Sequence, residues 1–251
     1  MNAFTKLAAA ATLAIAGLAA APAGATTIIN FAQYQQKNAG DTLVWTQSAA
    51  KTGGTLQDIG DPTVIFRLWD TDVAHGDPVE VLATLQFAGV VDDGNPAQTL
   101  AGFQVQQGLH GTFSFTSQQA FTRNGVDYAA GANLLSGAFS GGVIMGVATG
   151  AMSVDPLAGG SATYLSDVFN AGNLDFETFT ISLNAIHRGQ LNGLTHLSGK
   201  SLSNFTATTT GQFGAAVPEP GAWALMIVGF AGAGAMLRRR RTGPAAVALR
   251  I

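Results

Sequence analysis

Apolar and polar residues alternate along most of the chain between residues 26 and 216. In residues 79–88 every second position is apolar, at Val79, Val81, Ala83, Leu85 and Phe87. Residues 178–186 have the same period, with Phe179, Ile181, Leu183 and Ala185 in the apolar register. Shorter runs repeat it at Phe103/Val105, Phe113/Phe115 and Phe205/Ala207/Thr209. A period of two is typical of strands that bury one face, so these segments are predicted to be β-strands.

Clusters of Gly, Asn and Asp separate the alternating runs, for example at residues 92–96, 159–161 and 170–173. These residue types favour turns. We count roughly nine or ten strands and no amphipathic helix. The predicted fold class is therefore all-β, an antiparallel β-sandwich or jelly-roll-like domain. The glycine-rich residues 131–160 fit either paired strands with small side chains or a long loop.

The N-terminus has the pattern of a secretory signal peptide. Residues 1–6 carry one positive charge, residues 7–21 are apolar and mostly alanine, and Ala23, Gly24 and Ala25 have the small-x-small form of a cleavage site. We expect residues 1–25 to be removed after Ala25 and to take no part in the fold.

The C-terminus has the pattern of a single membrane span. Residues 221–237 contain no charge, and as a helix they extend about 25 Å, near the short limit for crossing a bilayer. Four consecutive arginines follow, Arg238, Arg239, Arg240 and Arg241. Because arginine crosses a bilayer at high cost, this cluster is expected to stay cytoplasmic as a topology signal. Residues 26–216 then lie outside the cytoplasmic membrane, and residues 242–251 form a cytoplasmic tail.

A short motif precedes the apolar run: Pro218, Glu219 and Pro220, then two residues, then Trp223 and Ala224. Together with the apolar run and the arginines, residues 217–241 resemble the PEP-CTERM sorting domain in its PEPxxWA variant. The resemblance implies a transient membrane anchor, processed near the motif by an exosortase-type enzyme. It also implies an envelope-bearing bacterium that makes exopolysaccharide, with the protein ending at the cell surface or outside the cell. The chain departs from the family pattern in continuing ten residues beyond the arginines.

The charge and the cysteine content of the chain exclude several classes of function. Residues 26–216 hold six Lys or Arg and fourteen Asp or Glu, a net charge of −8 that the overall −3 conceals. Nucleic-acid binding needs a basic surface, so no nucleic-acid partner is expected. The chain has no cysteine, which excludes disulfides, a thiolate nucleophile and cysteine-ligated metals. A segment of 191 residues is long enough for one domain with its own core.

One acidic cluster has the chemistry of a cation site. Asp70, Asp72 and Asp77 supply the oxygen ligands that Ca²⁺ prefers. An EF-hand loop starting at Asp70 needs Gly at its sixth position and Glu at its twelfth, where this chain has His75 and Val81. The favoured interpretation is a polar turn between the strand at residues 63–69 and the strand that starts at Val79. No metal or other cofactor is predicted, and Ca²⁺ is kept as the alternative.

No catalytic motif is found, and no catalytic residue is predicted. Gly-x-Ser-x-Gly is absent, and His110, His187 and His196 lack the spacing of metal ligands. We expect these histidines at surface or half-buried positions. Tyr34, Trp45 and Trp69 offer sugar-stacking platforms if exposed, although core packing is the expected use of a strand Trp.

Three functions fit this sequence. The default is a non-catalytic cell-surface or extracellular-matrix protein with a structural or adhesive role. The first alternative is a carbohydrate-binding module for exopolysaccharide, with or without calcium. The second is an exported hydrolase whose paired carboxylates, or carboxylate and histidine, are not recognisable from sequence.

Overall fold

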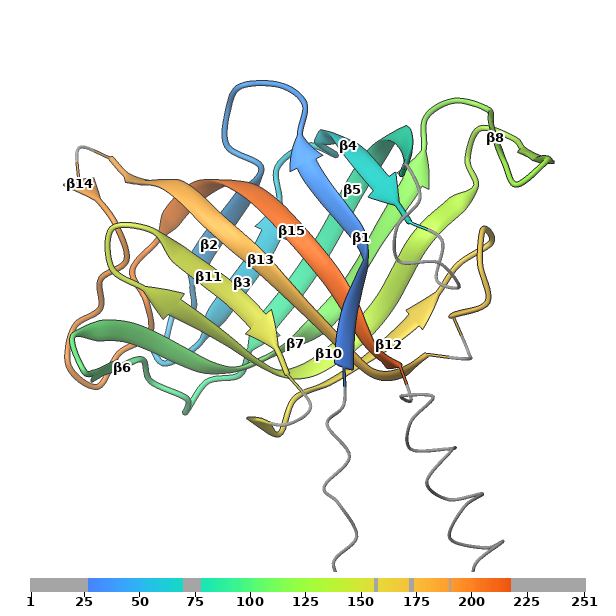
Figure 1. Ribbon diagram of the computed structural model, residues 1–251. Helices are drawn as coiled ribbons and strands as arrows, with labels where there is room; N and C mark the ends of the chain where they lie inside the picture. Colours follow the sequence, from blue (N-terminus) through green and yellow to red (C-terminus); the bar gives the residue numbers. More distant parts are fainter. Residues whose placement is uncertain (1–26, 70–77, 156–157, 172–173, 190, 218–251) are drawn as a thin grey trace, which may run out of the picture. The chain divides into compact units, whose positions relative to one another are not determined.

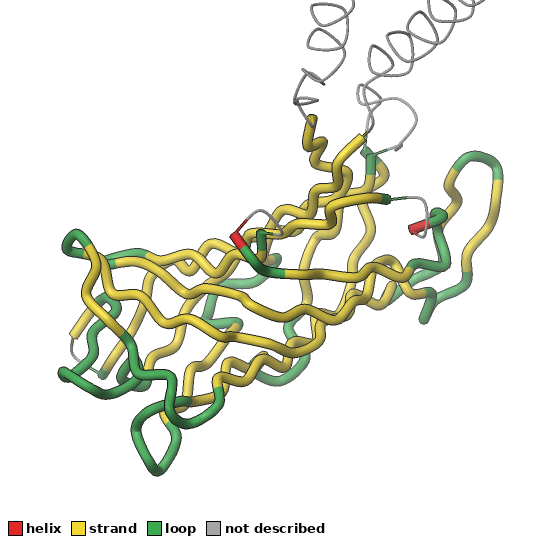
Figure 2. The backbone as a smooth tube through the Cα atoms, turned by 90° about the horizontal axis from the view of Figure 1, so that it is seen from below, coloured by secondary structure: helices red, strands yellow, loops and turns green. Residues whose placement is uncertain are grey.

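The computed structural model describes residues 27–69, 78–155, 158–171, 174–189 and 191–217. These residues form strands joined by turns, and the helical positions among them are short 3₁₀ turns at Ala158 and Ala171, red in Figure 2 (Figures 1 and 2). Residues Ile28–Ala216 make up one compact unit. The strands are β1 Thr27–Gln36, β2 Leu43–Gln47, β3 Gly54–Asp58, β4 Thr63–Leu68, β5 Val79–Val91, β6 Gln98–Leu100, β7 Phe103–Ser117, β8 Phe121–Arg123, β9 Val126–Tyr128, β10 Asn133–Gly146, β11 Gly150–Val154, β12 Ser161–Leu165, β13 Asp175–Arg188, β14 Leu191–Asn192 and β15 Phe205–Val217.

Thirteen strands belong to one antiparallel sheet whose pairings return to their starting point. In order, β5 pairs with β7, β7 with β10, β10 with β11, β11 with β13 and β13 with β15. From β15 the pairing continues through β2 and β3 back to β5. Opposite walls of this ring face each other across the core, as the two sheets of a sandwich do. The remaining two strands, β8 and β9, form a separate hairpin.

Two strand pairs, one beside the other along the strand direction, connect β5 to β15: β4 with β1, and β3 with β2. β4 pairs with residues 79–84 of β5, whereas β3 pairs with residues 88–91 of the same strand. On the other side, β2 pairs with residues 205–207 of β15, and β1 also pairs with β15. Because β1 pairs with β4, both connections between β5 and β15 are closed (Figure 1). Few backbone groups of the long strands are therefore left at a free edge.

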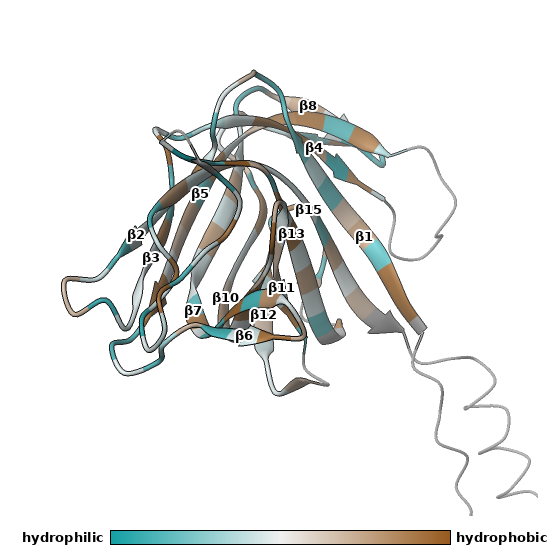
Figure 3. Cartoon of the chain, turned by 90° about the vertical axis from the view of Figure 1, so that its left-hand side faces the viewer, coloured by the Kyte–Doolittle hydropathy of each residue, from teal (hydrophilic) through white to brown (hydrophobic). Residues whose placement is uncertain are grey.

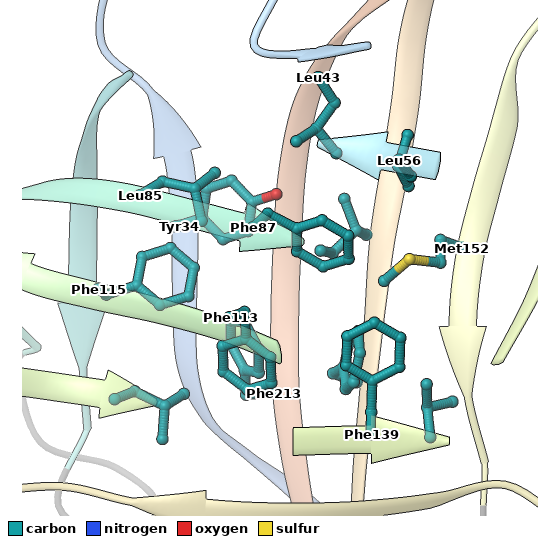
Figure 4. Packing of buried hydrophobic residues seen from close by; sticks show 14 of the residues in the cluster. Tyr34, Leu43, Leu56, Leu85, Phe87, Phe113, Phe115, Phe139, Met152 and Phe213 are labelled. Atoms are coloured by element: carbon teal, nitrogen blue, oxygen red, sulfur yellow. The ribbon is translucent and has the colours of Figure 1, made fainter. Parts of the chain in front are cut away.

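The core lies inside the ring and is rich in phenylalanine. In the long strands alternate residues are buried, as in β5, and Figure 3 shows hydrophobic and hydrophilic residues interleaved along the strands. Phe213 of β15 is at its centre, with ring centroids 5.2 Å from Phe113 and 5.4 Å from Phe115 of the facing wall (Figure 4). The buried hydrophobic core residues identified all lie between residues 31 and 215. The unit thus has the self-contained core of an independently folding domain.

A small polar network crosses this core beside Tyr34. The Tyr34 hydroxyl donates to Oγ1 of Thr209 at 3.1 Å, and that oxygen lies 2.8 Å from Oγ1 of Thr42. Burial raises the pKa of Tyr34, because the phenolate form is costly away from water. The ring lies over Gly211, where a Cβ atom would sit 2.2 Å from ring carbon Cε1. Gly211 is therefore the residue that lets the aromatic ring approach the β15 backbone.

The structure confirms the predicted all-β antiparallel class and extends the strand count to fifteen. Residues 79–88 form most of β5, with Val81, Ala83, Leu85 and Phe87 buried as expected. The glycine-rich residues 131–160 are paired strands, β10 and β11, rather than a long loop. Two predicted inward positions are wrong. Phe103 is 46% exposed at the start of β7, and Ala185 is exposed because β13 contains a bulge just before its end.

Candidate functional site

Several predicted site residues lie outside the described residues. These are the three aspartates Asp70, Asp72 and Asp77, the cleavage-site alanines Ala23 and Ala25, the motif residues Pro218, Glu219, Pro220, Trp223 and Ala224, and the arginines Arg238, Arg239, Arg240 and Arg241. Within the described part of the chain, no three His, Asp or Glu side chains gather as a metal-binding group. None of the described residues belongs to a helix long and apolar enough to cross a membrane.

The aromatic residues considered as sugar platforms are used in packing. Trp45 is fully buried, its ring stacks on Phe205, and its Nε1 donates to the carbonyl of Leu202 at 2.9 Å. Tyr34 is buried in the polar network described above. Trp69 is half-buried, and its carbonyl accepts a hydrogen bond from Arg123. The expectation that the strand tryptophan Trp45 packs in the core is confirmed.

A polar cluster that the sequence did not predict forms where β13 ends. The register of β13 against β15 shifts between Asn184 and His187, and Ala185 has φ of 45°. A positive φ is strained for a residue with a Cβ atom, and a bulge changes the direction of the side chains that follow it. The shift places His187 opposite Thr206 of β15. The bulge therefore directs His187 onto the outer face beside Thr206.

His187 and Thr206 share one carboxylate, that of Asp41 in the β1–β2 loop. His187 Nδ1 lies 3.1 Å and 3.3 Å from the two oxygens of Asp41. The Thr206 hydroxyl donates to Oδ2 of the same carboxylate. The Asp41 side chain is 25% exposed and that of His187 is 51% exposed. This pairing fixes the orientation of the imidazole and leaves Nε2 for an external group.

The three side chains do not have the arrangement of a nucleophilic triad. In such a triad the hydroxyl donates to the histidine, and the carboxylate holds the opposite ring nitrogen. Here the Thr206 hydroxyl donates to Asp41 instead. The arrangement is suited to holding the imidazole rigidly at the surface, and it supplies hydrogen-bonding capacity rather than an activated hydroxyl.

Next to this cluster lies a hollow of about 550 Å³. It is lined by the end of β13 with the following Gly189, by β2, and by the segment that leads into β15. Its volume is in the range of small-ligand sites. Hydroxyl and amide side chains contribute to the lining, at Thr46, Gln47, Ser203, Asn204 and Thr206, together with the cationic or polar side chains of His187 and Arg188.

Arg188 differs from the other two arginines of the described chain. Arg67 donates to Glu80 at 2.6 Å and to Gln35 at 3.1 Å. Arg123 is buried and donates to the carbonyls of Val168 and Trp69. The Arg188 Nε is also buried, yet it has no hydrogen-bond partner among the described residues. A buried guanidinium nitrogen without an acceptor is costly, so this group calls for an explanation beyond the fold.

A second hollow, of about 580 Å³, crosses β5, β7, β10 and β12 on the outer face of the sheet. Two rows of paired residues form its floor, Gln86–Ser114–Ser136–Leu165 and Ala88–Thr112–Ala138–Thr163. At one end, the Asp58 carboxylate accepts from the Phe87 amide at 2.8 Å, and Asp61 accepts from Gln86 at 3.2 Å. These carboxylates are thus hydrogen-bonded within the protein, in contrast to the Nε of Arg188, which has no partner among the described residues.

Comparison with family models, with curated proteins and with solved structures finds no match to this chain. The candidate site therefore rests on geometry alone. His187 is exposed on β13, in agreement with the expected surface or half-buried position, but its partner was not predicted. Asp41 is 146 residues away in the chain, and no local pattern links the two. The signal available was the break in alternation at Ala185-Ile186, which marks the bulge.

Proposed function

We propose that this chain is an exported, exosortase-sorted protein of the cell surface or extracellular matrix, with a non-catalytic structural or adhesive role. In this proposal residues 1–25 are removed, residues 217–241 anchor and sort the protein, and residues 26–216 are displayed outside the membrane. The sorting motif, the apolar run and the arginine cluster support the proposal, since their order at one chain end is what such a signal requires.

The observation that carries the display role is the position of the two ends of the domain. β1 and β15 pair with each other, and the side chain of Asn30 bonds that of Gln212, so the first and last strand segments lie side by side. The hollow beside His187 adjoins Thr206, near the start of β15. At about 3.3 Å per residue, it lies about 30 Å along that strand from Ala216. A domain attached through residue 217 would thus present this hollow away from its attachment.

Sorting is tested by membrane fractionation and intact-mass analysis of the protein in its host. We expect mature chains to start after Ala25 and to have lost the apolar run, with the domain in surface or extracellular fractions. Replacing Pro218 and Glu219 by alanine should leave the full C-terminus in the membrane fraction. Wild-type chains that keep residue 251 in a host with an exosortase would contradict the proposal.

Replacing Arg238, Arg239, Arg240 and Arg241 together by serine tests the anchor. Because Lys and Arg beside a span fix its orientation, we expect the domain to leak into the periplasm or medium. Arg250→Ser is the matched control, since it removes a positive charge from the tail rather than from the cluster. Unchanged membrane retention in the serine variant would show that residues 221–237 anchor the chain without the arginines.

A further inference from the structure

We propose that the hollow lined by His187 and Arg188 is a binding site for an acidic saccharide, with Arg188 holding a carboxylate of the sugar. This inference deepens the proposed surface role by naming a ligand class. It rests on the proposed surface role only for the location in which the protein would encounter the saccharide. The site lies among described residues at the end of β13, along β2 and at the start of β15.

Arg188 brings to the hollow a guanidinium whose Nε has no acceptor among the described residues. Arginine presents N–H donors in a planar fork that matches a carboxylate, and such charge-assisted bonds are among the strongest in proteins. Arg67 meets a carboxylate of the protein itself, whereas the Arg188 Nε is buried without an acceptor from the described residues. Nε has almost no exposed surface, so a ligand carboxylate in the hollow that Arg188 lines would meet the terminal nitrogens of the fork rather than Nε.

His187 is held in an orientation that suits a ligand in the hollow. Its Nδ1 is held by Asp41, so Nε2 is the ring nitrogen left for a ligand. It can accept from a sugar hydroxyl when the ring is neutral and donate when the ring is charged. The positive φ of Ala185 shows that the chain tolerates backbone strain next to this side chain. Such strain is concentrated at binding sites, where the direction of a side chain matters more than local stability.

The neutral polar residues that line the hollow fit sugar hydroxyls. The Oδ1 of Asn204 accepts a hydrogen bond from the backbone N–H of Gln47 at 2.7 Å. The two N–H donors of the Asn204 side chain therefore remain for a ligand. The hydroxyls of Thr46 and Ser203 belong to the same lining. Trp45 is buried below, so recognition would depend on hydrogen bonds and charge rather than on ring stacking. The net charge of −8 for residues 26–216 disfavours densely charged polyanions such as nucleic acids.

The test is calorimetric titration of residues 26–217 with trigalacturonate, a saccharide with one carboxylate per sugar. The comparison probe is the same trisaccharide with its carboxylates reduced to alcohols. We expect the charged probe to bind, and the neutral one to bind at least about tenfold more weakly, since the loss of one charge-assisted bond is of that order. Inorganic phosphate is the third probe. Equal binding of the neutral probe, phosphate binding as tight as the trisaccharide, or no binding at all would each overturn the proposal.

Two arginine variants locate the site. Arg188→Gln should weaken trigalacturonate binding at least about tenfold. Arg67→Gln is the matched control, because it removes the same charge from another polar hollow of the outer face, of about 310 Å³. It should leave affinity within about twofold, well below the effect of one charged bond. Wild-type affinity in Arg188→Gln, or lost affinity in Arg67→Gln, would place the ligand elsewhere.

If Arg188→Gln does not fold, NMR titration of the wild-type domain still tests the site. On adding trigalacturonate, the side-chain amide NMR signals of Gln47 and Asn204 and the ring signals of His187 should shift. Those of Gln33, Gln35 and Gln212, which line the hollow near Arg67, should not. The opposite pattern would refute the site. These measurements use purified protein, so a failure here is distinct from a failure of the sorting experiments.

Discussion

Asn30 donates a side-chain hydrogen bond to Gln212 over 3.1 Å, joining residues 182 positions apart in the chain. The bond lies between β1 and β15, the first and last strands of the domain. Each strand has further partners, β4 for β1 and β13 and β2 for β15. The first and last strands of the domain are therefore integral to the sheet, and the stability of the domain depends on both.

The phenylalanine at the centre of the ring should be a major source of stability. We predict that Phe213→Ala lowers the free energy of unfolding by about 3–5 kcal/mol, as removal of a buried aromatic ring usually does. Phe213 is fully buried and touches rings from both walls of the core. Urea unfolding measures the change. The matched control is Phe103→Ala, at a 46% exposed position, where a loss of about 0.5 kcal/mol or less is expected.

The domain should lose stability in alkali. Burial raises the pKa of Tyr34, and burial together with the charge of Glu177 raises that of Tyr164. Above about pH 10 the unfolded chain releases these phenolic protons while the folded chain keeps them. The folded state then binds more protons, so the free energy of unfolding falls as pH rises, by up to about 1.4 kcal/mol per pH unit for each tyrosine.

Urea midpoints measured between pH 8 and pH 11 test this, with Tyr34→Phe as the comparison. The variant should be less stable by about 1 kcal/mol at pH 8, because it loses the bond to Thr209. Its stability should then fall less steeply than that of the wild type above pH 10. Parallel curves for the two proteins would mean that Tyr34 ionises as readily in the folded state as in the unfolded one.

The strain at Ala185 is open to a direct measurement. Because Ala185 has φ of 45°, Ala185→Gly should leave stability unchanged or raise it by about 1 kcal/mol. The control is Ala88→Gly, at an exposed position of the regular strand β5, where we expect a loss of about 0.5–1 kcal/mol. Equal losses in both variants would show that the bulge does not strain Ala185.

Calcium should have little effect on the domain. If Asp70, Asp72 and Asp77 bound Ca²⁺ only in the folded state, a hundredfold excess over the dissociation constant would add about 2.7 kcal/mol. That is a rise of several degrees in Tm for a domain of this size, at about 2–4 °C per kcal/mol. We expect no rise beyond an equal concentration of Mg²⁺, consistent with a polar turn. A Ca²⁺-specific rise that Asp70→Asn with Asp72→Asn abolishes would establish the site instead.

How far the sequence predicts this protein depends on the distance over which each feature is encoded. The strand at residues 79–88 was predictable because alternation of Val81, Ala83, Leu85 and Phe87 is a local consequence of one buried face. The exposure of Ala185 was only partly predictable: the adjacent apolar residues Ala185 and Ile186 mark a break in alternation, but which of the two turns outward depends on the partner strand. The contact of His187 with Asp41 was hidden, because it arises only when the ends of β13 and β15 meet the β1–β2 loop. Closure of the strand ring likewise depends on which strands pair, and hydrophobic periodicity does not encode strand pairing.

The order of the strands also bears on when this domain can become folded. β15 pairs with β13, β2 and β1, yet it is the last of them to leave the ribosome. Contacts between such distant segments form slowly, and until they form the apolar faces of the earlier strands stay open to other chains. A chain ending before residue 205 lacks the strand that carries Phe213 and closes both connections to β5. Synthesis of β15 is thus the event that commits this domain to its native state.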